Sequence, residues 1–273
     1  MSESPATFRM KTTNMAQCGK SQNGFTLIEL IIVIVLLGIV GAMGASFISE
    51  AFKGFFGADV RMEMYEEGKS ALVRMEREIH IALPNAVFVS DTTTTGDTIS
   101  VGLIDEKAMS PVFGQYTEPH PTDGITDPTA ALPINTLVSI YNTSWDVFAD
   151  SSRIYRVASL SGPGNRKMNF TETIGSTSPN GRYYAIRPEA VRFSVANGVL
   201  SRSTATVTAT NTLGGFGPPQ TLAKNIGQDG TLPYFTYTPG TSARNSMVSI
   251  HFAISRNDET VNFHKEVAIR NVP

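Results

Sequence analysis

The chain has 273 residues and a formal net charge of −2, a length that suits one ordinary domain with an appendage or two small domains. Proteins that bind nucleic acid through its phosphates usually carry a basic excess, so this charge argues against a nucleic-acid role for the whole chain. The single cysteine, Cys18, lies near the N-terminus. Residues 25–273 can therefore form neither an internal disulfide nor a thiolate metal site.

A polar, basic stretch precedes a long apolar run. Residues 1–24 contain Arg9, Lys11 and Lys20 with one acid, whereas residues 30–49 carry no charge. Twenty helical residues span about 30 Å, which is the thickness of a bilayer core. We therefore expect residues 30–49 to cross a membrane once, with the basic flank in the cytoplasm and the C-terminal region exported.

Glu29 is an acid at the start of this apolar run. A carboxylate within a membrane is costly and is usually retained because it has a partner. Cleavage of the bond between Gly24 and Phe25 would provide that partner, because a new α-amino group would appear on Phe25, close to Glu29 in the sequence.

The sequence Gly24-Phe25-Thr26-Leu27-Ile28-Glu29 resembles the class III signal of type IV pilins and of the pseudopilins of type II secretion. This resemblance implies that a prepilin peptidase removes residues 1–24 as a leader and methylates the amine of Phe25. It also implies that Glu29 pairs with the N-terminal amine of a neighbouring subunit. The implied partners are the peptidase, other pilin subunits and an inner-membrane assembly platform.

Two other interpretations of the N-terminus compete with this one. An ordinary secretory signal could end at the small residues Ala42 and Gly44, but a long n-region and an early carboxylate are atypical of such signals. A plain single-pass anchor explains the apolar run and gives no reason for Glu29. We therefore favour the pilin-type signal.

An amphipathic pattern follows the apolar run. Apolar or small residues recur every three or four positions, at Met64, Gly68, Ala71, Leu72, Met75, Ile79 and Leu83. We predict one helix over residues 25–84, about 90 Å long if straight, which Pro84 helps to end. Glycines interrupt its middle, and two interpretations stay open: a segment that can bend, or close helix packing through small residues.

The remaining residues, 85–273, contain short β-prone runs separated by Pro, Gly, Ser, Thr and Asn, which predicts a β-rich head. Expected strands are 86–90, 98–104, 137–141, 153–160, 183–187, 191–196, 199–203, 205–210, 246–255 and 260–269, and Asn197-Gly198 is a strong hairpin signal. Residues 105–136 and 211–233 are expected to be long loops. The predicted fold class is α+β and pilin-like, with a long N-terminal helix packed against an antiparallel sheet.

The last hairpin can be predicted to the level of its register. With Asn257-Asp258 as a two-residue turn, Ile254 faces Val261 and Phe252 faces Phe263 on an apolar face. This alternation is typical of a half-buried antiparallel sheet.

In the same register His251 faces His264, and Glu266 lies on the same polar face. Two imidazoles and a carboxylate are ligands that Zn²⁺ accepts, but we favour a solvated polar face and expect no metal and no cofactor. The chain has no P-loop, no Gly-x-Ser-x-Gly and no His-Glu-x-x-His. We therefore expect no enzymatic activity.

Residues 71–87 carry a finer resemblance, because the helix is expected to end there at an Ala-Leu-Pro-Asn corner. This corner is similar to that of the O-type minor pilins of the mannose-sensitive haemagglutinin (MSHA) pilus, and to that of the J-type minor pseudopilins of type II secretion. The resemblance implies a low-copy subunit that primes or caps a filament. It would sit in the inner membrane with its head in the periplasm, and later in the pilus or pseudopilus. An adhesin at the filament tip is the alternative of another class.

Overall fold

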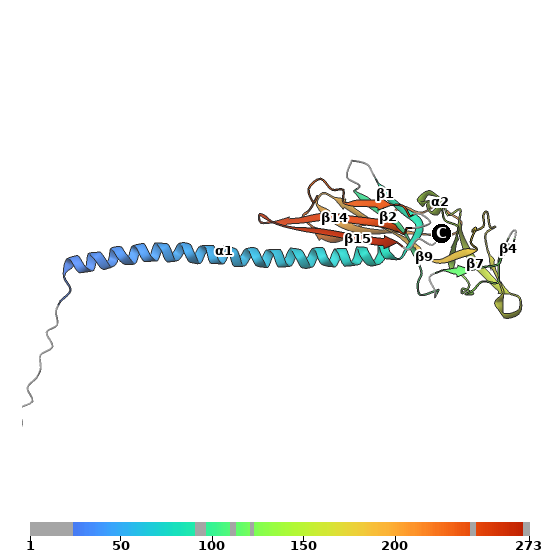
Figure 1. Ribbon diagram of the computed structural model, residues 1–273, viewed down its shortest axis with the longest axis horizontal. Helices are drawn as coiled ribbons and strands as arrows, with labels where there is room; N and C mark the ends of the chain where they lie inside the picture. The colour runs from blue at the N-terminus through green and yellow to red at the C-terminus, as the bar shows by residue number, and fades with distance from the viewer. Residues whose placement is uncertain (1–23, 91–96, 110–112, 121–122, 241–243, 270–273) are drawn as a thin grey trace, which may run out of the picture. The chain divides into compact units, whose positions relative to one another are not determined.

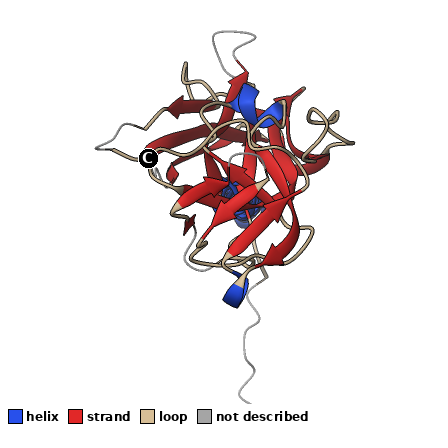
Figure 2. Cartoon of the chain, turned by 90° about the vertical axis from the view of Figure 1, so that its right-hand side faces the viewer, coloured by secondary structure: helices blue, strands red, loops and turns tan. Residues whose placement is uncertain are grey.

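The computed structural model describes residues 24–90, 97–109, 113–120, 123–240 and 244–269 (Figure 1). Contacts between residues divide the chain into two units, residues 1–54 and residues 55–273, each described by itself below. The fold class is α+β as predicted, because the long helix α1 (Leu27–His80, Figure 1) is followed by a head built mainly from antiparallel strands, which are red in Figure 2.

The elements follow one another in this order along the chain. They are α1 (Leu27–His80), β1 (Ala82–Ser90), β2 (Thr98–Ile104), β3 (Gly114–Gln115), β4 (Glu118–His120), β5 (Gly124–Thr126), β6 (Leu137–Ile140), α2 (Trp145–Ala149), β7 (Ile154–Ser161), the 3₁₀ turn η1 (Pro163–Asn165), β8 (Lys167–Phe170), β9 (Arg182–Ala196), β10 (Val199–Thr206), β11 (Gln220–Lys224), β12 (Ile226–Gly227), β13 (Phe235–Thr238), β14 (Ser246–Arg256) and β15 (Glu259–Ile269).

The strands of the described residues form two sheets. In the larger sheet the order is β1-β2-β9-β6-β7-β8-β5-β4, while β10 and β3 also pair with β9, and β11 pairs with β10. In the smaller sheet β14 is central and pairs with β12, β13 and β15. Both sheets contribute to one apolar core together with the second half of α1.

That core uses the predicted helical stripe. Within α1 the buried residues are Met64, Gly68, Ala71, Met75 and Ile79. They recur every three or four positions, so they lie on one side of the helix. The other side chains of this core come from strands of both sheets, β2, β9, β14 and β15 among them, so the predicted packing of the sheet on the stripe is confirmed.

The last hairpin has the predicted register. Ile254 pairs with Val261 and Phe252 pairs with Phe263, and the rings of the two phenylalanines stack with centroids 4.9 Å apart. The Asn197-Gly198 turn likewise joins β9 to β10, with Ala196 paired with Val199. Both asparagine turns have the positive φ angles that such two-residue turns require.

The helix ends earlier than the predicted residue 84. It stops at His80, and β1 begins at Ala82 and includes Pro84. Ala82 pairs with Leu103, and the carbonyl of Ile81 accepts a hydrogen bond of 2.9 Å from the N–H of Ile104. Because these residues are buried against β2, the chain satisfies their backbone groups in the sheet rather than in another helical turn.

Two regions that were expected to be loops contain short strands, and some strands that were expected to be separate form a single strand. Residues 105–136 include β3, β4 and β5, and residues 211–233 include β11 and β12. These strands have two to five residues, too few to show a period in the sequence. The expected strands 183–187 and 191–196 are parts of β9, whose pairing with β2 shifts register beside Pro188. The expected strands 199–203 and 205–210 are likewise replaced by one strand, β10, which ends at Thr206.

Candidate functional site

The peptide bond between Gly24 and Phe25 lies just outside the start of α1. Residues 24–26 are not helical, and α1 begins at Leu27. Gly24 is exposed, and the Phe25 side chain is 82% exposed. A backbone that precedes a helix and is exposed has the conformational freedom that a peptidase needs in its substrate.

Thr26 caps the helix that follows this bond. Its hydroxyl accepts a hydrogen bond of 3.3 Å from the N–H of Glu29, and its carbonyl accepts from the N–H groups of Glu29 and Leu30. The spacing Thr-x-x-Glu is that of a capping box. Sequence reasoning missed Thr26, although this spacing was the signal that would have identified it.

Glu29 occupies the first turn of α1, where its backbone N–H is bound by Thr26. A negative charge in the first turn is favoured by the helix dipole. Glu29 is exposed within the chain, so its carboxylate is available to a group from another molecule. The dipole explains why the helix tolerates this acid, but it does not explain an acid at the edge of a membrane-spanning run.

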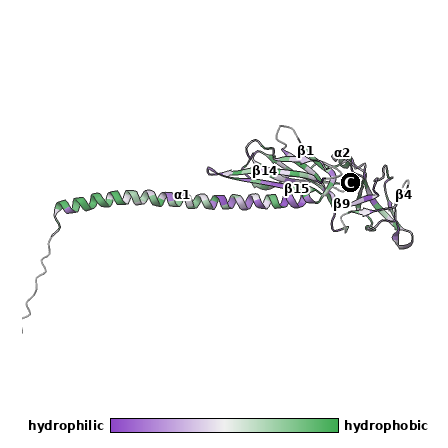
Figure 3. Cartoon of the chain, viewed as in Figure 1, coloured by the Kyte–Doolittle hydropathy of each residue, from purple (hydrophilic) through white to green (hydrophobic). Residues whose placement is uncertain are grey.

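The first half of α1 is apolar on every side. Its side chains are exposed from Leu27 to Gly54, and Figure 3 shows that hydrophobic residues dominate this stretch. Within the described residues, α1 is the one helix long and apolar enough to cross a membrane. No Cβ placed at Gly38, Gly41 or Gly44 would meet another atom within 4 Å. These glycines therefore leave a surface on which another helix can approach closely.

Ion pairs join the second half of α1 to strands of the head. Arg202 of β10 binds both carboxylate oxygens of Glu78, at 2.8 and 3.1 Å, and both side chains are mostly buried. At the tip of the last hairpin Arg256 binds Glu63 at 2.9 Å and Glu67 at 2.8 Å. The Nε–H of Arg202 is shared between the two oxygens of Glu78, whereas Arg256 uses two nitrogens for its two acids. Hydrogen bonds between charged groups are stronger than those between neutral groups.

The structure brings His251 and His264 together, with ring centroids 4.2 Å apart and planes 22° apart. Glu266 pairs with Ser249 instead, on the same polar face. Among the residues that the structure describes, no group of three or more His, Cys, Asp and Glu side chains could hold a metal ion. Burial, followed by the nearby His264, lowers the pKa of His251.

The comparisons with known proteins concern the N-terminus alone. Residues 19–45 match the family model described as the prokaryotic N-terminal methylation motif. No curated protein and no solved structure matches the chain. The motif covers Gly24, Phe25 and Glu29, and it implies processing by a prepilin peptidase and assembly with other pilins. The N-terminus of this chain is thus a class III signal of the type IV pilin kind, followed by a helix suited to a membrane.

Proposed function

We propose that the protein is a minor pilin that primes or caps assembly of an MSHA-like type IV pilus. The observation that carries this proposal is the methylation motif joined to a helix that is apolar all round and then amphipathic. The apolar half waits in the inner membrane and later joins a bundle of helices in the filament. The amphipathic half holds the head, which faces the periplasm before assembly.

Two features of the mature chain support a low-copy subunit. Removal of residues 1–24 from 273 leaves 249 residues, without a cysteine, and the described residues of the head form three separate apolar clusters. A subunit that is repeated along the whole filament is expected to have a more compact head than this one.

Glu29 selects its neighbour in this mechanism. After cleavage the amine of Phe25 is a cation at the end of an apolar helix, and it needs an anion once it leaves water. The carboxylate of Glu29 on an adjacent subunit would neutralise it, and this pairing would set the register between helices. The amine of Phe25 and the carboxylate of Glu29 are each costly in the membrane when unpaired, and pairing between subunits reduces both costs.

Variants of Glu29 test the pairing. Glu29→Gln keeps a side chain that can serve in a capping box but removes the charge. Its leader should be cleaved normally, and its incorporation into filaments should fall by at least about tenfold, the equivalent of about 1.4 kcal/mol. Immunoblotting of membranes and sheared filaments measures both steps. Glu50→Gln, at another exposed acid of α1, is the matched control and should assemble normally.

Normal incorporation of Glu29→Gln would overturn the pairing. A loss of cleavage instead would mean that Glu29 acts in recognition by the peptidase.

A minor pseudopilin of type II secretion is the second candidate, because the same class of signal serves that machine. Deletion of the gene separates the two functions. Loss of pili with normal export of secreted enzymes supports the pilus, and the opposite result supports the secretion system.

A further inference from the structure

A cavity of about 360 Å³ opens on the head where the start of β1 meets the loop after β6 and the residues before β9. Its size lies within the range of small-ligand pockets. The wall contains two aromatic rings, Tyr141 and Tyr184, together with several amides and hydroxyls and one cation, Arg182. No carboxylate is present among the described residues that line it.

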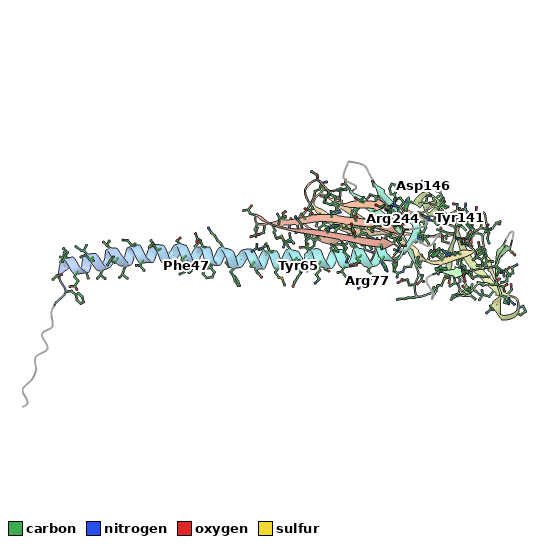
Figure 4. All side chains as sticks on the ribbon, viewed as in Figure 1. Phe47, Tyr65, Arg77, Tyr141, Asp146 and Arg244 are labelled. Carbon is green, nitrogen blue, oxygen red and sulfur yellow. The ribbon has the colours of Figure 1, made fainter. Side chains whose placement is uncertain are left out.

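Tyr141, labelled in Figure 4, lines this cavity and has an unusual backbone conformation. Its φ is 55°, which bulky residues rarely adopt, and its side chain is 42% exposed. Strained backbone of this kind is concentrated at ligand sites. The guanidinium of Arg153 lies 5.6 Å from the centre of the Tyr141 ring and holds one side of it.

The amides beside Tyr141 are held in place by one another. The side chain of Asn85 donates to the carbonyl of Asn142 at 3.1 Å, and the side chain of Asn142 donates to the carbonyl of Pro84 at 3.2 Å. The side-chain oxygen of Asn142 is buried and accepts no hydrogen bond from the described residues. These hydrogen bonds fix the geometry of the wall, so a polar ligand would meet amides that need little reorganisation.

The residues before β9 that line the cavity are also fixed. The N–H of Ser178 donates to the hydroxyl of Tyr116 at 2.9 Å, and the N–H of Gly181 donates to the carbonyl of Ser178 at 3.0 Å. Burial raises the pKa of Tyr184 to about 12, and a tyrosine hydroxyl is protonated in neutral solution even at its usual pKa of about 10. The cation of Arg182 stacks on the ring of Phe113, 4.8 Å from its centre.

We propose that this cavity binds a sugar residue that carries a carboxylate, of the uronic-acid type, within a glycan. The C–H face of a pyranose would pack on the exposed ring of Tyr141, and its hydroxyls would bind the amides of Asn85 and Asn142. A planar guanidinium matches a carboxylate in shape and charge, so Arg182 would bind the acid group. The absence of a lining carboxylate among the described residues removes the repulsion that an anionic ligand would meet. This site goes beyond the filament role and does not depend on which machine assembles the protein.

A matched pair of sugars tests the chemistry. Methyl glucuronide and methyl glucoside differ in having a carboxylate or a hydroxymethyl group at one carbon. Saturation-transfer NMR with the full chain in detergent should show saturable binding of the glucuronide, at least about tenfold tighter than that of the glucoside. Equal binding of the two sugars would overturn the assignment, and so would no saturable binding of the glucuronide.

Variants of Tyr141 test whether the glucuronide binds in this cavity. Asparagine tolerates a positive φ, so Tyr141→Asn should keep the fold, which thermal unfolding checks, and should weaken binding of the glucuronide at least about tenfold. Tyr141→Phe keeps the ring and should bind like the parent chain. Unchanged binding by Tyr141→Asn would refute the site. If that variant unfolds, Arg182→Gln takes its place and should abolish the preference for the glucuronide over the glucoside.

Discussion

Residues 27–54 and residues 55–80 belong to one helix, α1, but their side chains have opposite surroundings. In the first segment every side chain is exposed, and residues 30–49 carry no charge. In the second segment Met64, Met75 and Ile79 are completely buried in the core of the head. The same secondary structure therefore needs two different environments to be stable.

The difference indicates how each segment is stabilised. An apolar helix gains nothing from water, and in a membrane it satisfies its own backbone groups. An amphipathic helix gains its stability from burial of one side. A substitution in the second segment should therefore affect the folding of the head, whereas the same substitution in the first segment should leave it unaffected.

Loss of a buried side chain should give the largest contrast. Met75 is 0% exposed, whereas Leu36 is 54% exposed. Met75→Ala removes core contacts and leaves a cavity, so it should lower the free energy of unfolding of the head by about 2–5 kcal/mol. Leu36→Ala should leave that free energy unchanged. Denaturant unfolding of the full chain in detergent, followed by near-UV circular dichroism, measures both. Equal effects of the two changes would contradict the contrast.

Addition of a methyl group at a glycine should give a smaller contrast between the two segments, caused by overpacking rather than by a cavity. A Cβ at Gly68 would lie 2.2 Å from the ring of Phe263, which stacks on Phe252 and on Tyr65 and cannot move freely. A Cβ at Gly54 would meet nothing within 4 Å.

Gly68→Ala should therefore destabilise the head by about 1–3 kcal/mol, despite the better helix propensity of alanine. Gly54→Ala should show only that propensity, a gain of up to about 1 kcal/mol in the helix. The same unfolding experiment measures the first change, and the helical signal in far-UV circular dichroism measures the second. A stabilised Gly68→Ala variant would show that the contact with Phe263 is loose.

Acid should give the smallest contrast, between the first segment and the head that packs on the second segment. Burial and the neighbouring His264 lower the pKa of His251, against the opposite influence of Asp229 and Glu266. The folded head therefore holds this proton less tightly than the unfolded chain, whose histidines have a pKa of about 6.5. The stability that depends on neutral His251 is present above that pH and is lost as the pH falls through the lower folded value.

The thermal midpoint of the head should thus decrease between about pH 7.5 and pH 5.5. His251→Gln should remove most of this dependence. His264→Gln should remove less of it, because burial of His251 is the larger cause. Residues 30–49 contain no group that titrates, so their helix should be insensitive to acid. A dependence that survives in His251→Gln would assign it to other groups.

Local patterns predicted much of this molecule. The stripe on α1 was readable because a helix repeats every 3.6 residues, and the pairing of His251 with His264 followed from a two-residue turn and a period of two. The class III signal was readable because Gly24, Phe25 and Glu29 stand at fixed spacings before an apolar run. Each of these features depends on residues that are close together in the chain.

The end of α1 and the cavity of the head depend on distant residues. Ile81 leaves the helix because Ile104 donates to its carbonyl, and this contact has no sign in the sequence around Pro84. The cavity joins Asn85 to Asn142 and Arg182, three residues that no motif connects. The sequence alone thus determined the N-terminal signal, the apolar helix and the last hairpin, since these follow from local patterns. Only the tertiary structure decided where the helix stops and which polar side chains converge, because burial and pairing across the sheets act between distant parts of the chain.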